Sequence, residues 1–226
     1  MIKQRSFCYA GSCHNNLMEF CQDQTAVRTD GGKNTVVLCD GAGNSLYGGI
    51  AARICAETIA EHMQKNFEKY LFEESAAVKR EVIQKLRRAL SGYACAHHID
   101  EKALASTILA VTMDNNGRFA GLHLGDGIIL WKISGRKDLE IVSSPENGLD
   151  AGSTFLTMNC KMFYHLKFFR WRKPEAERIL LITDGMFPIL SQISNSSFDV
   201  GNEAGLQQLI RENHLFDDCS YGLLEL

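Results

Sequence analysis

Aspartates stand at the ends of strongly apolar, strand-like segments of this sequence. The clearest case is Asp40, which follows the apolar run 35–39 and is itself followed by Gly41. Glycine at this point leaves room for a backbone carbonyl or a water molecule to come close to the carboxylate. The acidic positions of this kind are Asp23, Asp40, Asp126, Asp184 and the pair Asp217 and Asp218.

Carboxylates that separate strands deliver can meet at one end of a sheet. Because like charges repel, carboxylates that converge either share protons or bind a cation. A site built from oxygen ligands alone suits Mg²⁺ or Mn²⁺ rather than zinc. Asp-Gly pairs are also ordinary turn chemistry, which would explain any single one of them. Several such positions beside apolar strands favour a divalent-cation site over a set of unrelated turns.

The elements that must position these aspartates follow from the hydrophobic pattern. Apolar residues that recur every three or four positions predict helices over 48–71, 75–96 and 203–212. Residues 135–151 are polar and predict a loop, whereas 106–133 predicts an antiparallel meander with glycine turns. Strands are predicted at 6–10, 24–28, 35–39, 106–113, 119–124, 128–133, 155–158, 178–183 and 220–224, with one or two more in 162–171.

This order of elements lacks the regular alternation of strand and helix that a parallel sheet requires. It therefore predicts an α+β fold with antiparallel sheets covered by helices. The length of 226 residues and the hydrophobic content of 45% suit one large domain. The 24 basic and 27 acidic side chains give a formal net charge of −3, without the basic excess typical of nucleic-acid binders.

The ends and the cysteines of the sequence bear on its compartment. The first residues include basic side chains but no apolar run, so no secretory signal is predicted, and no segment approaches the about 18 consecutive apolar residues of a membrane span. Eight scattered cysteines without a Cys-x-x-Cys pair predict reduced thiols in a cytoplasmic protein. Cys13 and His14, close to Cys21, leave a zinc site as the alternative.

Taken together and in order, the acidic motifs resemble those of the metal-dependent Ser/Thr protein phosphatases of type 2C, in particular their compact bacterial branch. The resemblance spans nearly the whole chain, so residues 1–226 are interpreted as a single type 2C phosphatase-like domain. The segments that carry it are 11–14 with 21–23, 37–43, 105–107, 123–127, 180–186 and 217–220.

The resemblance implies a fold of α-β-β-α layers, in which two antiparallel sheets form a sandwich flanked by pairs of helices. It also implies a binuclear centre of Mn²⁺ or Mg²⁺ at one end of the sandwich. An activated water would attack phosphorus there, with Asp40 and Asp184 as the catalytic carboxylates. The implied ligands are Asp40 as the bridge between the two ions, Asp23 and the carbonyl of Gly41 on one ion, and Asp184 and Asp217 on the other.

Several positions depart in part from the family pattern. Asp126 matches a residue associated with a third, weaker metal site, but Pro188 stands where the aspartate of that site often lies. Residues 15–20 lack the arginine that grips the substrate phosphate in many members. His14 is the candidate replacement, and a histidine satisfied within the sheet is the alternative. Ala42 replaces the histidine that many members carry after the first Asp-Gly pair.

The expected activity is therefore hydrolysis of phosphoserine and phosphothreonine in a protein, the product of a Ser/Thr kinase. The sequence has neither a Cys-x₅-Arg loop nor an Asp-x-Asp-x-Thr nucleophile, which disfavours the phosphatases that form a covalent intermediate. Two alternatives remain open. One is a catalytically weak or inactive relative that binds a phosphoprotein or a regulator. The other is a partner-switching phosphatase that acts on an anti-sigma antagonist. No nucleic-acid or membrane partner is expected, and the oligomeric state is left open.

Overall fold

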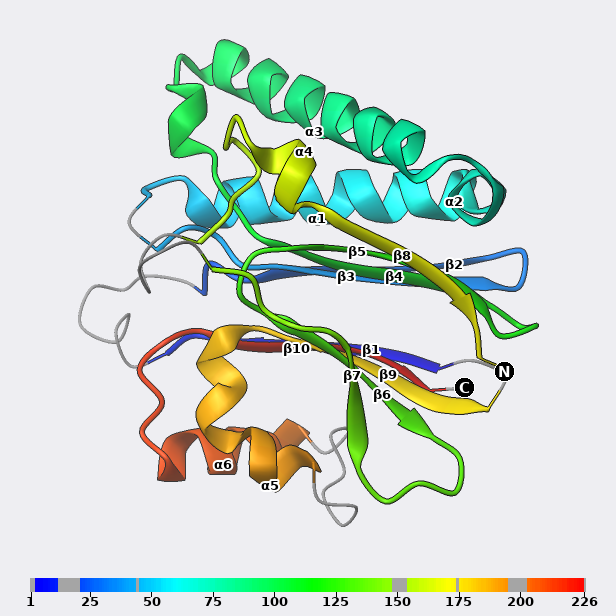
Figure 1. Cartoon of the computed structure of the whole chain (residues 1–226). Helices are drawn as coiled ribbons and strands as arrows, with labels where there is room; N and C mark the ends of the chain where they lie inside the picture. The colour runs from blue at the N-terminus through cyan, green and yellow to red at the C-terminus, as the bar shows by residue number, and fades with distance from the viewer. Residues whose placement is uncertain are drawn as a thin grey trace.

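The structure is a computed structural model that describes residues 3–11, 21–43, 45–147, 154–173, 175–194 and 203–225. Two antiparallel five-stranded sheets pack face to face, with helices on both outer faces (Figure 1). The predicted α+β sandwich is therefore confirmed. No helix in the described ranges is long and apolar enough to span a bilayer.

One sheet has the strand order β2-β3-β4-β5-β8, with every neighbouring pair antiparallel. Its strands β3 and β4 are buried along almost their whole length, which explains their continuous apolar sequences. The bounds are Gln24–Asp30 for β2, Lys33–Cys39 for β3, Ile108–Asp114 for β4, Arg118–Leu124 for β5 and Lys167–Arg172 for β8.

The other sheet has the strand order β1-β10-β9-β6-β7 and is also antiparallel. Between the two sheets lies an apolar layer that includes Leu38, Leu109, Ile129 and Leu181, each at most 1% exposed. The bounds are Lys3–Tyr9 for β1, Cys219–Glu225 for β10, Ala176–Ile182 for β9, Ile128–Ile133 for β6 and Leu139–Ser143 for β7.

Helices cover the outer faces of both sheets (Figure 1). The first sheet is covered by α1 (Gly48–Lys65), α2 (Phe67–Phe72), α3 (Ser75–His97) and α4 (Met162–His165), with the short 3₁₀ helix η2 (Glu101–Ala103) after α3. The second is covered by the 3₁₀ helix η3 (Asp184–Ile189), α5 (Leu190–Ser194) and α6 (Glu203–Glu212).

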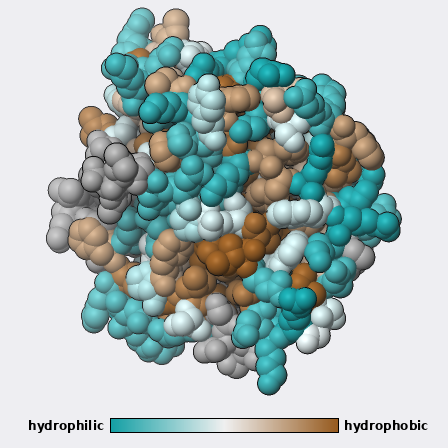
Figure 2. All heavy atoms as spheres, viewed as in Figure 1, coloured by the Kyte–Doolittle hydropathy of each residue, from teal (hydrophilic) through white to brown (hydrophobic). Residues whose placement is uncertain are grey.

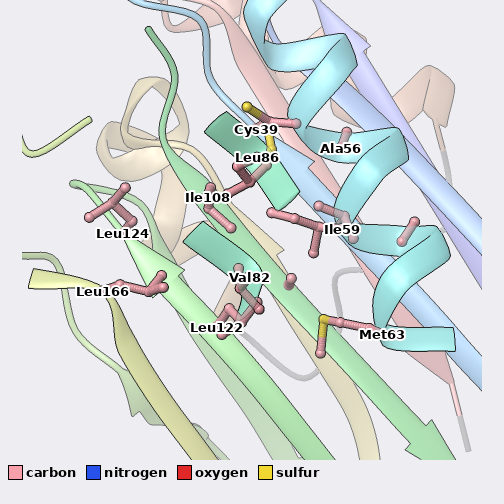
Figure 3. Packing of buried hydrophobic residues seen from close by; sticks show 14 of the residues in the cluster. Cys39, Ala56, Ile59, Met63, Val82, Leu86, Ile108, Leu122, Leu124 and Leu166 are labelled. Carbon is pink, nitrogen blue, oxygen red and sulfur yellow. The ribbon is translucent and has the colours of Figure 1, made fainter. Parts of the chain in front are cut away.

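Side chains of α1 and α3 form a core over the first sheet. Ile59 and Met63 of α1 and Leu86 of α3 point toward Ile108 and Leu122 of the sheet (Figure 3). Each of these five is at most 1% exposed, so truncating one to alanine is expected to cost about 2–5 kcal/mol. This core holds α1 in place, and α1 begins directly after the loop that follows β3.

The helix predicted over 48–71 is interrupted at Asn66, so that prediction was wrong in its middle. The structure has α1 ending at Lys65 and α2 starting at Phe67. The side-chain amide of Asn66 donates a hydrogen bond to the carbonyl of His62 at 3.0 Å. Asparagine competes with the helical backbone in this way, which explains a break that an apolar stripe alone does not predict.

The predictions for the segment between β6 and β9 were partly wrong. Residues 135–151 were predicted to be a loop but contain the edge strand β7, on which Ile141 is 61% exposed. Hydrophobic side chains reach the surface between the two layers, in the region where Figure 1 places β7 (Figure 2). The strand predicted at 155–158 is absent. The amide of Thr157 instead donates to the carbonyl of Ser106 at 3.0 Å from a turn. Residues 162–171 form α4 and most of β8.

The antiparallel meander predicted for 106–133 is also wrong at its last step. β4 and β5 pair with each other, but β6 belongs to the opposite sheet and pairs with β9 and β7. Gly125, with φ +108°, redirects the chain between the sheets, a conformation open to glycine. As a consequence, Asp126 lies on the crossover that joins the two layers.

Candidate metal centre

Three carboxylates from both sheets meet at one end of the sandwich. Asp40 follows β3, Asp126 lies on the crossover between β5 and β6, and Asp184 follows β9. One carboxylate oxygen from each lies within 4.8 Å of the others. Asp126 therefore shares a cluster with Asp40 and Asp184 instead of lying apart from them.

The backbone around Asp40 is held against the segment that precedes β4. The amide of Asp40 donates to the hydroxyl of Thr107 at 2.9 Å, and its carbonyl accepts from the amide of Thr107 at 2.8 Å. The hydroxyl of Ser106 donates to the same carbonyl at 2.9 Å. A Cβ atom at Gly41 would overlap the backbone of Gly48, so only glycine fits directly after Asp40. The backbone that carries the carboxylate is thus fixed by neighbours that bring no positive charge.

Asp23 precedes β2 and is only 1% exposed. Its Oδ2 accepts a hydrogen bond from the hydroxyl of Thr183 at 3.0 Å. Its Oδ1 is buried and has no hydrogen-bond partner among the residues that the structure describes. Because an unpaired buried carboxylate oxygen is costly, this atom is suited to a cation.

The pKa shifts in the cluster also favour a bound cation. Burial raises the pKa of Asp40 well above its usual value, and the charges of Asp23, Asp184 and Asp126 raise it further. Burial, then Asp126 and Asp217, raises the pKa of Asp184 to about 6. Carboxylates placed like this cannot all ionise unless a cation compensates them. A set of oxygen donors with surplus negative charge fits Mg²⁺ or Mn²⁺.

The two aspartates before β10 differ in what they do. Asp217 is exposed, and its Oδ1 accepts a hydrogen bond from the amide of Asp218 at 2.8 Å. Asp218 is 5% exposed, and its two oxygens accept from the amides of Gly11 and Gln22 at 2.9 and 2.6 Å. The choice of Asp217 rather than Asp218 as a metal ligand stays a prediction, and the backbone bonds of Asp218 agree with it.

Some sequence-based predictions lie beyond what the structure describes, and some positions were missed. His14 and Cys13 lie outside the described residues, so the phosphate-binding and zinc interpretations stay untested. The hydroxyl of Thr154 donates to Oδ2 of Asp126, and nothing in the sequence around Thr154 indicated this. Thr183, which donates a hydrogen bond to Asp23, stands directly before Asp184. Its place in that motif is the sequence signal that could have identified it.

A family model described as Protein phosphatase 2C matches residues 10–214. Comparison with curated protein sequences gives no match.

Solved structures share the fold. The serine/threonine phosphatase Stp1 from Staphylococcus aureus is 16% identical, with 100% of this chain and 95% of that chain covered and a TM-score of 0.76. The catalytic domain of the serine threonine protein phosphatase PstP, in complex with two manganese ions, is also 16% identical (99% and 97% covered, TM-score 0.67). PppA, a regulatory component of the T6SS in Pseudomonas aeruginosa, is 15% identical (99% and 97% covered, TM-score 0.65). Because the family model spans most of the sequence, this chain belongs to the protein phosphatase 2C family.

Proposed function

We propose that this protein is a phosphatase that hydrolyses phosphoserine and phosphothreonine monoesters of proteins and depends on two divalent cations, Mn²⁺ or Mg²⁺. The observation that carries the proposal is the convergence of Asp40, Asp126 and Asp184, with one oxygen of each within 4.8 Å of the others. Membership of the family supports it, and so do the two manganese ions of PstP.

The residues of the chain have separate roles in this proposal. When bound, divalent cations at this site supply a water nucleophile of lowered pKa and positive charge for the phosphoryl oxygens. Asp126 belongs to the same cluster and is the candidate ligand of any further ion. The residues that would hold the two ions are Asp40, Asp23 with the carbonyl of Gly41, and Asp184 with Asp217.

A covalent route through the nearest cysteine is disfavoured. Cys39 directly precedes Asp40 but is fully buried in the core between α1 and the first sheet. Burial raises the pKa of its thiol well above the usual value, so it is neither accessible nor ionised. Direct attack by water is the route that these residues favour.

The test is hydrolysis of p-nitrophenyl phosphate and of a phosphothreonine peptide by the full chain, with Mn²⁺ present and after treatment with a chelator. We expect turnover with Mn²⁺ and none with the chelator. Equal turnover in both conditions would contradict the proposal. Calorimetric binding of Mn²⁺ without any turnover would instead identify a non-catalytic relative that retains the site.

A further inference from the structure

One buried carboxylate joins three segments of the chain beside the candidate metal centre. Oδ1 of Asp218 accepts from the amide of Gly11, just after β1, at 2.9 Å. Oδ2 accepts from the amide of Gln22, just before β2, at 2.6 Å. Asp218 itself directly precedes β10 and is 5% exposed. Both oxygens therefore act as acceptors for backbone donors that are remote in the sequence.

The bond to Gln22 acts on the residue next to a proposed metal ligand. Asp23 follows Gln22, and its side chain is held from the other direction, because Oδ2 accepts from the hydroxyl of Thr183. That hydroxyl accepts in turn from the amide of Ser220 at 3.1 Å. Asp218 thus holds the backbone of Gln22, next to Asp23, and Ser220 at the start of β10 holds the carboxylate of Asp23 through Thr183. Of the two carboxylate oxygens of Asp23, Oδ1 has no hydrogen-bond partner within the described residues.

The bond to Gly11 acts on the other side of the same junction. A Cβ atom at Gly11 would overlap the carbonyl group of Asp217, so the segment just after β1 packs against the backbone of a second proposed ligand. Asp218 therefore stands between Asp23 and Asp217, bonded to one neighbour of the first and next in sequence to the second. A shift of this side chain would move both.

We propose that Asp218 is a positioning residue of the metal centre: its carboxylate sets the spacing between Asp23 and Asp217 without binding a cation itself. This inference rests on the proposed function, because it requires that cations bind at this end of the sandwich. A carboxylate suits the role, since two backbone amides need two acceptor oxygens. An asparagine would turn an NH₂ group toward one of those donors.

The test compares Mn²⁺ binding by the full chain and by two variants, Asp218→Asn and Asp218→Glu, in titration calorimetry without substrate. Asp218→Asn keeps the shape but loses one acceptor and the charge, whereas Asp218→Glu keeps the charge but changes the reach. We expect both to bind Mn²⁺ about 10–100-fold more weakly, the size typical of partners that orient metal ligands. If Asp218→Glu binds as tightly as the unmodified chain, the effect is one of charge alone and the inference is overturned.

A matched control comes from the opposite end of the sandwich. Asp114 also accepts two backbone amides, those of Asn116 and Arg118, both at 2.9 Å. We expect Asp114→Asn to lower the melting temperature while Mn²⁺ affinity stays unchanged; an equal loss of affinity would overturn the inference. Failure of both Asp218 variants to fold, judged by circular dichroism, would assign Asp218 to stability and overturn it too. If the unmodified chain itself binds no Mn²⁺, the proposed function fails together with this inference. The outcomes named for the variants overturn this inference alone, so the two failures can be told apart.

Discussion

The two ends of the sandwich treat their carboxylates in opposite ways. Asp114 pairs across the ladder with Lys33 at the start of β3, whereas Asp40 follows the end of that strand. In the turn after β4, Asp114 accepts from the amides of Asn116 and Arg118 and from Nε of Arg118 at 2.7 Å. Burial opposes ionisation, but these bonds hold the pKa of Asp114 below its usual value. The chain itself supplies the partners of this carboxylate.

At the acidic end the chain supplies carboxylates and leaves their compensation to something else. Burial first, and then Asp23, Asp184 and Asp126, raises the pKa of Asp40. The same residue type thus has a lowered pKa where an arginine and backbone donors surround it, and a raised pKa where other acids do. The difference teaches that an Asp in a turn indicates a cation site only when its neighbours are acids from other strands.

The largest expected effect is loss of turnover at the acidic end. Asp40→Asn and Asp184→Asn each replace a carboxylate of the cluster with a neutral amide, which is a weaker metal ligand. We expect the rate of p-nitrophenyl phosphate hydrolysis with Mn²⁺ to fall by more than about 10–100-fold, the loss typical when a residue that orients a metal ligand is removed. Asp114→Asn, the matched change at the other end, should leave the rate unchanged. Full activity in either cluster variant would contradict the assigned site.

The next effect is stabilisation by the metal. A cation that binds only the folded chain at 100 times its dissociation constant adds about 2.7 kcal/mol to the free energy of unfolding. Thermal melting with and without excess Mn²⁺ should show this increase in the unmodified chain and in Asp114→Asn. Asp40→Asn should lose most of it. An increase of equal size in Asp40→Asn would mean that Mn²⁺ stabilises the chain elsewhere.

Between the two layers, His123 shows how the fold treats a fully buried histidine. It is fully buried, with Nδ1 and the hydroxyl of Ser143 2.7 Å apart and Nε2 3.2 Å from the carbonyl of Gly125. Burial, followed by the charge of Lys167, lowers its pKa from 6.5 to about 4, although Glu146 acts in the other direction. His123 is therefore neutral at pH 7, and Nε2 carries the proton that the carbonyl of Gly125 accepts.

The sign of the pH effect follows from that shift. Between pH 6.5 and 4 the unfolded chain binds more protons at His123 than the folded chain, so stability decreases as the pH falls. From pH 7 to pH 5 the loss is about 2 kcal/mol. Urea unfolding at both pH values, with chelator present, should show a smaller loss in His123→Gln than in the unmodified chain. Identical losses in the two proteins would show that His123 is not the group responsible.

Much of the fold could be predicted from local sequence, because apolar runs and helical periodicity act over a few residues. β6 was predicted with its bounds, and so was α6. The crossover of β6 into the opposite sheet was not, since only the pairing with β9 decides it. β7 was missed because an edge strand needs no continuous apolar run: its residues lie half-exposed beside β6.

In the candidate site, too, local sequence identifies some features, whereas others depend on tertiary contacts. Asp40 and Asp184 could be singled out because strand, aspartate and glycine are adjacent in the sequence. Other contacts join segments that only the folded chain brings together: Thr154 donates to Asp126, and the amides of Gly11 and Gln22 donate to Asp218. Sequence therefore indicates which carboxylates converge, and tertiary contacts decide which residues hold them.

The smallest effect tests the comparison by its sign. Asp114→Asn gives up the charged bond to Nε of Arg118, which is 33% exposed, so solvent reduces the loss to about 1 kcal/mol, or about 2–4 °C in melting temperature. Asp40→Asn removes one of several mutually repelling carboxylates and should raise the melting temperature of the chelator-treated protein. Calorimetric melting of both variants in chelator measures the two shifts side by side. Two shifts of the same sign would mean that the acidic cluster is already compensated within the chain and does not require a cation.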